Sequence, residues 1–247
     1  MRPLRRPMPM PQRVRAVVLP LALVAALVPT ACRTVSAAPA VPRVVEVPSR
    51  PAFIKPPGGS EHPARSGQVL ASRTLLRTQL PGRIQVQLAN GRNFRLGGDA
   101  VARLAGDGVA LEQGQIIAWV NPGSKRTAPL RIRTRVATAS IMGTTVFIDA
   151  TADAVKVFSW EGHVSVTTDT GQHFELHSGQ QLVFAQGRWT PPQRLTPEEA
   201  STRRRRSILL NGFETPMETL PVIERELGLS PLAAPTAPIA PAASPAR

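Results

Sequence analysis

This sequence of 247 residues contains a single cysteine, Cys32, and no tyrosine. A disulfide needs two thiols, so the chain cannot form one within itself. Aromatic residues make up only 4% of the chain, whereas proline accounts for 26 residues. This composition predicts one domain of ordinary size flanked by segments that lie outside its packed core.

Long apolar runs are also missing, because no internal run reaches the ~18 residues of a membrane-spanning helix. The run Ala16–Val28 follows five arginines and is too short to cross a bilayer comfortably. With the small residues Val35–Ala37 behind it, this start is typical of a secretory signal peptide. We expect residues 1–37 to be removed, which eliminates the only thiol, and the mature chain to be secreted or periplasmic. The alternative is a lipoprotein anchored through Cys32.

Acidic residues are few, with 16 Asp and Glu against 30 Lys and Arg and a formal net charge of +14. Six of the basic residues and none of the acidic ones lie in residues 1–37, so 24 basic and 16 acidic residues leave the mature chain at +8. This charge favours anionic partners such as phosphorylated or carboxylated polymers of the cell envelope. Nucleic acid is the usual partner of a basic chain, but export argues against it.

Apolar residues recur at every second position over much of residues 66–190, which is the period of a β-strand. Turn residues such as Asn90-Gly91 and Thr170-Gly171 break these runs about every ten residues. The spacing predicts an all-β domain built as a roll, sandwich or solenoid. The hairpin around Asn90-Gly91 is expected to have one dry face, with Gln85 and Gln87 on the other.

The segments on either side of this domain differ in composition. Residues 38–65 are rich in proline and are predicted to form a semi-extended linker. Thr196 and Glu199 have the spacing of a helix capping box, and short helices are expected within residues 196–228. Residues 229–247 are rich in proline and alanine and are predicted to be a disordered tail.

Four consecutive arginines, Arg203–Arg206, fall in the first of these helices. On a helix they are spread by about 100° each and cannot all serve one face. We therefore interpret this helix as solvated and only weakly attractive to anions.

A series of motifs in a fixed order resembles the FecR domain, an extracytoplasmic β domain of bacteria, over about Ser66–Gly187. The matching positions are Thr134, Ala137, Ile141, Gly143, Thr144 and Phe147, then Val155–Val166 and Leu176–Gln180. The resemblance implies a β-roll or short β-solenoid-like fold. Its structural motif positions here are Gly143, Thr144, Glu161, Gly162, Gly179 and Gln180. Gly143 follows a run of small and large residues that suits a corner, so we expect positive φ there.

The resemblance also implies a role in signalling. In the best-known members a cytoplasmic helical segment holds a sigma factor, and a single membrane helix leads to the FecR domain. This sequence has an export signal at its N-terminus instead, so direct control of a sigma factor is not expected.

The sequence contains no catalytic constellation. Ser165 and His163 are close on one strand but have no nucleophile elbow and no buried carboxylate pair beside them. His173, Glu175 and His177 alternate on a strand, which puts the two histidines about 13 Å apart and too far to share one ion. We predict no enzymatic activity, no cofactor and no metal.

The candidate contact residues are basic. Arg131, Arg133 and Arg135 are expected on one face of a strand whose other face is apolar, and Lys125 and Arg126 precede them. Guanidinium groups in a row can bind carboxylate, phosphate or sulfate groups. The alternative is an ordinary outward face of an edge strand, where charge prevents aggregation.

Two functions are consistent with these features. The first is a non-catalytic interaction or sensor module that binds another protein of the cell envelope through sheet edges or the basic stripe. The second is a module for anionic cell-wall or extracellular polysaccharide. Saccharide sites usually contain exposed aromatic rings, and only Trp160, on the same face as Lys156 and Phe158, suggests one.

Overall fold

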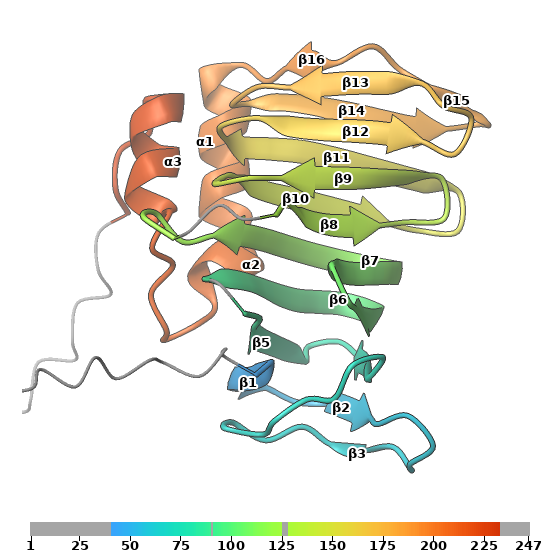
Figure 1. Ribbon diagram of the computed structural model, residues 1–247. Coiled ribbons are helices and arrows are strands. Elements are labelled where there is room, and N and C mark those ends of the chain that lie inside the picture. The colour runs from blue at the N-terminus through green and yellow to red at the C-terminus, as the bar shows by residue number, and fades with distance from the viewer. Residues whose placement is uncertain (1–40, 90, 125–127, 233–247) are drawn as a thin grey trace, which may run out of the picture. The chain divides into compact units, whose positions relative to one another are not determined.

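A computed structural model describes residues 41–89, 91–124 and 128–232 (Figure 1). All of them belong to the unit Ala37–Arg247. The predicted signal peptide lies outside the described residues, as does the predicted tail from residue 233 onward. The described chain is mainly β, as the sequence predicts, with a few short helices near its C-terminus.

The strands belong to one 16-stranded sheet. Their bounds are β1 (Arg43–Ser49), β2 (Ala52–Lys55), β3 (His62–Pro63), β4 (Leu75–Thr78), β5 (Arg83–Gln87), β6 (Arg92–Ala105), β7 (Gly108–Val120), β8 (Leu130–Arg133), β9 (Ala137–Ile141), β10 (Thr145–Ala150), β11 (Ala154–Glu161), β12 (Val164–Thr168), β13 (His173–Leu176), β14 (Gln180–Ala185), β15 (Arg188–Trp189) and β16 (Gln193–Arg194). Three helices follow in the described part: α1 (Pro197–Arg206), α2 (Ile208–Asn211) and α3 (Leu220–Leu227).

The long hairpin β6–β7 bends in its middle, and this bend lets each strand serve two parts of the sheet. The register runs straight from Arg92↔Val120 to Gly97↔Gln115, then skips to Val101↔Gln113. Gly114 lies at the skip with φ +84°, and a Cβ there would be 2.3 Å from the Cα of Ala100. Only glycine allows the two backbones to approach this closely.

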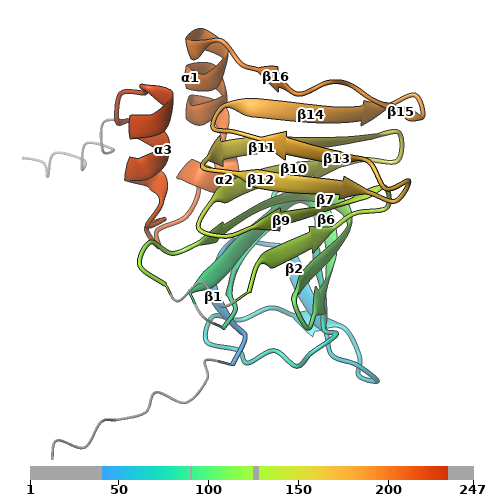
Figure 2. The same ribbon diagram turned by 45° about the horizontal axis from the view of Figure 1, so that its top comes forward.

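The first half of β7 pairs in parallel with β8, and its second half pairs with β10. From this branch the strand order continues as β8, β9, β12 and β13 on one side and as β10, β11, β14 and β15 on the other. Figure 2 shows these two layers one in front of the other. Their inward side chains form one core that includes Ile132, Ala139 and Val166 from the first layer and Ile148, Val157 and Leu182 from the second.

The predicted linker over residues 38–65 is wrong, because three strands form within it. β1 pairs with β5, and β2 pairs with β3 and β4. Val44 and Ile54 from these strands are buried in the core. Prolines are tolerated because they lie at the ends of short strands, where no ladder donor is needed. The folded unit therefore begins near Arg43 rather than Ser66.

The second layer has a second buried face, opposite the main core. Ile117 and Trp119 of β7 and Phe158 and Trp160 of β11 point outward from the layer and form a separate apolar cluster. Leu209, Leu210, Met217 and Ile223 of the C-terminal segment cover them, as the position of α1, α2 and α3 in Figure 1 illustrates. We call residues 196–229 the C-terminal strap.

The helix signals in the strap are confirmed. Thr196 and Glu199 form the capping box of α1, and Gly228 ends α3 with φ 63°. However, the helix breaks at Ser207, which ends α1 and caps α2.

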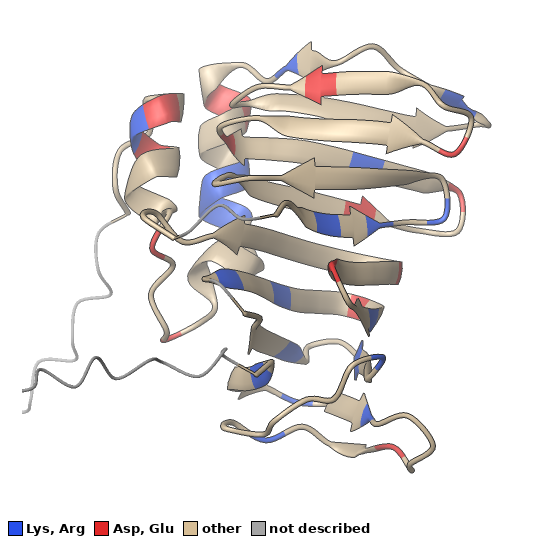
Figure 3. Cartoon of the chain, in the orientation of Figure 1, with Lys and Arg blue, Asp and Glu red and all other residues tan. Residues whose placement is uncertain are grey.

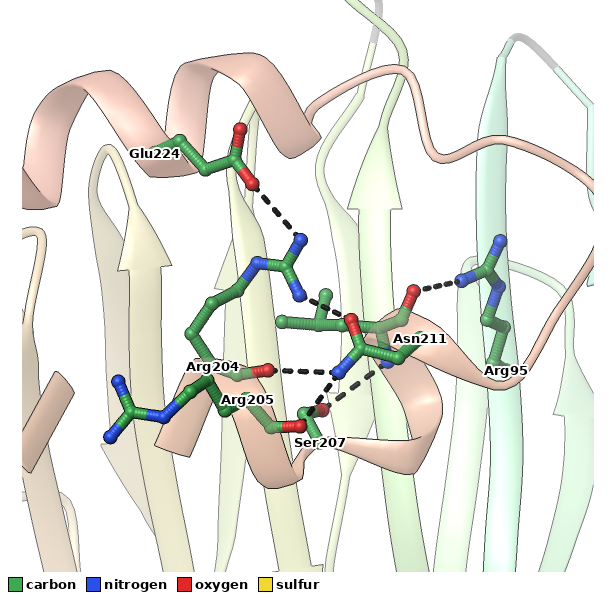
Figure 4. A network of polar contacts seen from close by, with 7 residues as sticks. Arg95, Arg204, Arg205, Ser207, Asn211 and Glu224 are labelled. Atoms are coloured by element: carbon green, nitrogen blue, oxygen red, sulfur yellow. Dashed lines mark hydrogen bonds and ion pairs between the residues drawn. The ribbon is translucent and has the colours of Figure 1, made fainter. Parts of the chain in front are cut away.

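The prediction that the arginine-rich helix is solvated is wrong for Arg204, which is 4% exposed. Its guanidinium bonds to Asn211 of α2 and, at 2.9 Å, to Glu224 of α3, so that one side chain links the three helices (Figure 4). The phase of α1 buries Arg204 and half-buries Arg203, while Arg205 and Arg206 remain exposed.

A buried arginine joins the strap to the sheet. Arg95 of β6 is 1% exposed and donates to Gln85, to the carbonyl of Leu209 at 2.9 Å and to that of Thr215 at 2.6 Å. Its guanidinium lies 4.2 Å from the ring centre of Phe213. Burial lowers the pKa of Arg95 to about 10 against the charges of Glu46 and Glu218, so Arg95 remains charged at neutral pH.

Glu46 of β1 holds the same part of the strap. Its carboxylate accepts hydrogen bonds from the backbone nitrogens of Glu214 and Thr215, both at 2.8 Å. Burial raises the pKa of Glu46, but these bonds and the charge of Arg95 outweigh burial and hold the pKa below its ordinary value. The carboxylate form is therefore favoured by folding.

We expect the stability difference between the parent and Glu46→Gln to depend on pH. A lowered pKa stabilises the fold above the unfolded pKa and ceases to do so as pH falls through the folded pKa. The parent should therefore be more stable at neutral pH, and the difference should disappear as the pH falls through the lowered pKa of Glu46. Denaturant unfolding of both proteins across this range measures it, and a difference independent of pH would contradict the role of the charge.

Candidate functional site

Two residues of the predicted arginine stripe, Arg131 and Arg133, lie on the outside of the first layer, whereas Arg135 contacts residues of the second layer. β8 alternates so that Leu130 and Ile132 are buried while Arg131 and Arg133 are exposed. Arg135, just beyond the strand, is exposed as well. Figure 3 shows the basic residues along β8. Lys125 and Arg126 lie outside the described residues.

The three arginines have different surroundings. Arg131 forms an ion pair with Asp107 at 2.8 Å, and both side chains are about half exposed. Arg135 donates to the carbonyl of Thr151 at 3.3 Å and lies over the ring of Phe184. Arg133 makes no hydrogen bond within the described residues. Its charge helps to lower the pKa of Asp107, although the hydrogen bond from Arg131 is the larger cause.

Hydroxyl groups continue this face across the neighbouring strands. Arg133 is paired with Thr138 of β9, which is paired in turn with Thr167 of β12. Arg131 is likewise paired with Ser140 of β9, which is paired in turn with Ser165 of β12. Because paired residues share a face of the sheet, the arginines and hydroxyls form one polar platform. We call Arg131, Arg133, Thr138, Ser140, Ser165 and Thr167 the arginine–hydroxyl face.

The alternative interpretation of the stripe as an edge strand is wrong, because β8 lies between β7 and β9. The free edges are elsewhere. In the described part of the sheet β13 pairs only with β12, and β15 pairs only with β14. The arginine–hydroxyl face thus extends to one such edge, where Glu175 and His173 of β13 are exposed.

The motif residues instead anchor α3. The side chain of Thr145, next to Thr144, donates to Glu161 at 2.9 Å and bonds to Thr219 at 2.7 Å. The backbone nitrogen of Gly162 donates to Ser178 at 2.9 Å and to Glu226 at 3.0 Å. These contacts bring the end of β11 and the start of β10 to one helix, which gives the motif a structural role.

The remaining motif residues form corners. Gly143 has φ 83°, as the sequence predicts for a corner. The nitrogen of Gly179 donates to the carbonyl of Ser159 at 2.8 Å, and the Gln180 side chain accepts from the nitrogen of His177. The rings of His163 and His177 lie 4.3 Å apart. The described residues contain no group of three His, Cys, Asp or Glu that could hold a metal ion.

Sequence reasoning grouped Lys156, Phe158 and Trp160 but missed the strap that covers them, so the exposed ring expected at Trp160 is in fact 1% exposed. Lys156, Phe158 and Trp160 follow each other on one face of β11, and that alternation is visible in the sequence. Arg203 of α1 lies over the ring of Phe158 with its guanidinium carbon 4.4 Å from the ring centre. No local signal links α1 to β11, because the contact depends on how the strap docks.

Comparisons with known proteins show what part of the chain resembles. Residues 74–165 match the model of the family described as FecR protein. Two solved structures of a putative anti-sigma factor from Parabacteroides distasonis are similar at 19% identity. One match covers 50% of this chain and 59% of that chain with a TM-score of 0.41, and the other covers 48% and 54% with a TM-score of 0.37. The chain thus spans less than two thirds of these proteins. No protein with a curated description matches it.

Proposed function

We propose that this chain, which carries a FecR domain over residues 74–165, is a non-catalytic interaction or sensor module that binds another component of the cell envelope. The family match supports a regulatory module in general terms. Secretion or a periplasmic location, with anchoring through Cys32 as the alternative, is supported by the signal-like N-terminal sequence. None of the helices in the described ranges is long and apolar enough to span a bilayer.

The observation that carries this proposal is the difference between the two outer faces of the sheet. The strap covers the outer face of the second layer, whereas no described segment covers the arginine–hydroxyl face of the first. That face is basic on one side and bounded by the free edge of β13. A protein partner can pair with the edge through its backbone while its acidic side chains contact Arg131 and Arg133.

The second candidate partner is an anionic polysaccharide. Arginine beside threonine and serine hydroxyls suits carboxylate and sugar hydroxyl groups. The face carries no Trp or Phe among its named residues, so contact with a polysaccharide would rest mainly on charge. Such binding should weaken strongly with salt, whereas backbone pairing at a strand edge should persist.

We expect the double variant Arg131→Ser, Arg133→Ser to fold like the parent but to bind its partner several-fold more weakly, because exposed charges contribute little to stability and more to association. The test measures retention of solubilised envelope proteins and of polygalacturonate on the immobilised chain at ~0.05 M and ~0.5 M salt. Arg205→Ser is the control, since Arg205 is also an exposed arginine but belongs to α1 of the strap rather than to the first layer.

The outcomes separate the two partners. A retained protein that is lost from the double variant but largely survives high salt supports the protein partner. Polygalacturonate retained only at low salt supports the polysaccharide. Equal retention by the parent and the double variant would show that the arginine–hydroxyl face is not the contact surface.

A further inference from the structure

A pocket of about 210 Å³ lies between the second layer and the strap. Its walls come from two parts of the chain that are far apart in sequence. The sheet supplies Gln115, Phe147, Lys156 and Trp160, and the strap supplies Arg203, Arg206, Ser207, Ile208 and Leu209. A water needs roughly 10–15 Å³ of such volume. The pocket therefore has room for an organic molecule and not only for a bare ion.

Two residues that line this pocket each have a buried hydrogen-bond donor without an acceptor among the described residues. Trp160 is 1% exposed, and its indole Nε1 has no partner among the described residues. The same holds for the buried Nη1 of Arg203, whose Nη2 donates to Gln181 at 3.0 Å. By contrast, Nε1 of Trp119 on the same sheet face donates to Asn121 and to Glu218, each at 3.0 Å. Buried donors are normally satisfied, so two unsatisfied donors in one pocket point to a missing acceptor.

The positive charge of the pocket walls indicates that the missing acceptor is an anion. Lys156, Arg203 and Arg206 line the pocket, and no acidic side chain among the described residues does so. Two carboxylates near these walls have other partners: Asp149 accepts from Gln115 at 3.2 Å, and Glu199 closes the capping box of α1. Glu198 and Glu199 line a neighbouring hollow that shares Lys156, Arg203 and Arg206. Burial lowers the pKa of Arg203 while Glu199 opposes it. An anionic group would compensate the buried positive charge.

We propose that this pocket binds a small organic anion, namely a carboxylate attached to a ring or other apolar body. The carboxylate accepts from Trp160 Nε1 and Arg203 Nη1, with Lys156 and Arg206 adding charge. Phe147, Ile208 and Leu209 contact the apolar body. The site is separate from the arginine–hydroxyl face, so it stands whether or not that face binds a partner.

Binding at this site has a consequence for the strap. The anion contacts β10 and β11 as well as α1 and α2, so it is held only while the strap is docked. A ligand that binds only the docked form stabilises that form. The pocket can thus couple the concentration of a small anion to the docking of the C-terminal strap.

The test uses the full ¹⁵N-labelled chain and benzoate as the probe. The indole N–H signals of Trp119, Trp160 and Trp189 are assigned by triple-resonance NMR and followed during titration to ~20 mM, which detects dissociation constants in the millimolar range. We expect the Trp160 signal to shift in a saturable manner and the Trp119 signal, which already has acceptors, to stay. Benzyl alcohol, which has the ring without the charge, should cause no saturable shift.

Matched variants locate the charge. Arg206→Gln should weaken benzoate binding about tenfold, the effect of one lost charge-assisted contact. Arg205→Gln, at the neighbouring exposed residue that does not line the pocket, should leave binding unchanged. Lys156→Met serves as the second variant if Arg206→Gln destabilises the strap.

The proposal is overturned if the Trp160 signal does not move, or if benzyl alcohol shifts it as benzoate does. It is also overturned if Arg205→Gln weakens binding as much as Arg206→Gln. If acetate binds as tightly as benzoate, the proposed contact between the pocket and an apolar body of the ligand is wrong.

Discussion

Gly114→Ala is expected to lower the free energy of unfolding by about 3–5 kcal/mol, which is a large part of the stability of an ordinary domain. Two costs combine at this position. A side chain at φ +84° is strained, and the new Cβ would lie 2.3 Å from the Cα and 2.6 Å from the nitrogen of Ala100. Backbone atoms cannot move aside as a flexible side chain can, so the bend of β6–β7 itself must change.

The matched control is Gly123→Ala. Gly123 has a similar φ of +78°, but a Cβ there meets nothing within 4 Å. It therefore carries the conformational strain without the collision and should cost only ~1–2 kcal/mol. Denaturant unfolding of both variants gives the comparison. Equal losses would mean that the close approach at Ala100 does not determine the fold of the hairpin.

Arg95→Met is the second change with a large expected effect. Methionine fills a similar space but leaves the carbonyls of Leu209 and Thr215, together with the carboxylate of Glu46, without the guanidinium that compensates them. Removing one partner from a buried charged network typically costs about 3–5 kcal/mol. We expect the strap to detach before the sheet unfolds, because the lost contacts join the strap to the sheet.

Limited proteolysis and chemical denaturation measure the two parts of this expectation. Arg95→Met should be cleaved within residues 196–229 much faster than the parent. Arg103→Met, on the same strand but in an exposed ion pair with Glu112, should behave like the parent within ~0.5 kcal/mol. A strap that stays protected in Arg95→Met would show that its apolar contacts alone hold it.

Alternation in the sequence was enough to predict many of the strands and the two sides of β8. It failed for β5, where Gln85 was expected on a wet face but is 3% exposed and accepts from the buried Arg95. Leu130 and Ile132 point into the core and Arg131 and Arg133 point out, because successive side chains on a strand lie on opposite faces. The same local logic located the capping box of α1 and the corner at Gly143. Each of these features depends on residues close together in the chain.

The strands β1, β2 and β3 escaped prediction because their apolar residues are few and their partners lie elsewhere. Val44 is buried against residues of β5, and Ile54 is paired with Leu76 of β4. Prolines between these short strands suggested a linker. A strand this short forms only when it pairs with the edge of a sheet. Here that edge consists of residues later in the chain.

The sequence alone determined that this protein is mainly β, with Arg131 and Arg133 on the outward side of a strand and a short helical C-terminal segment. Only the tertiary structure decided what each outward face meets. Phe158 and Trp160 were assigned to one side of a strand by alternation, but the strap that covers them begins some 35 residues later. Arg95 and Arg204 are buried for the same reason: burial of a polar side chain depends on which distant segment supplies its partners, and local sequence does not encode that contact.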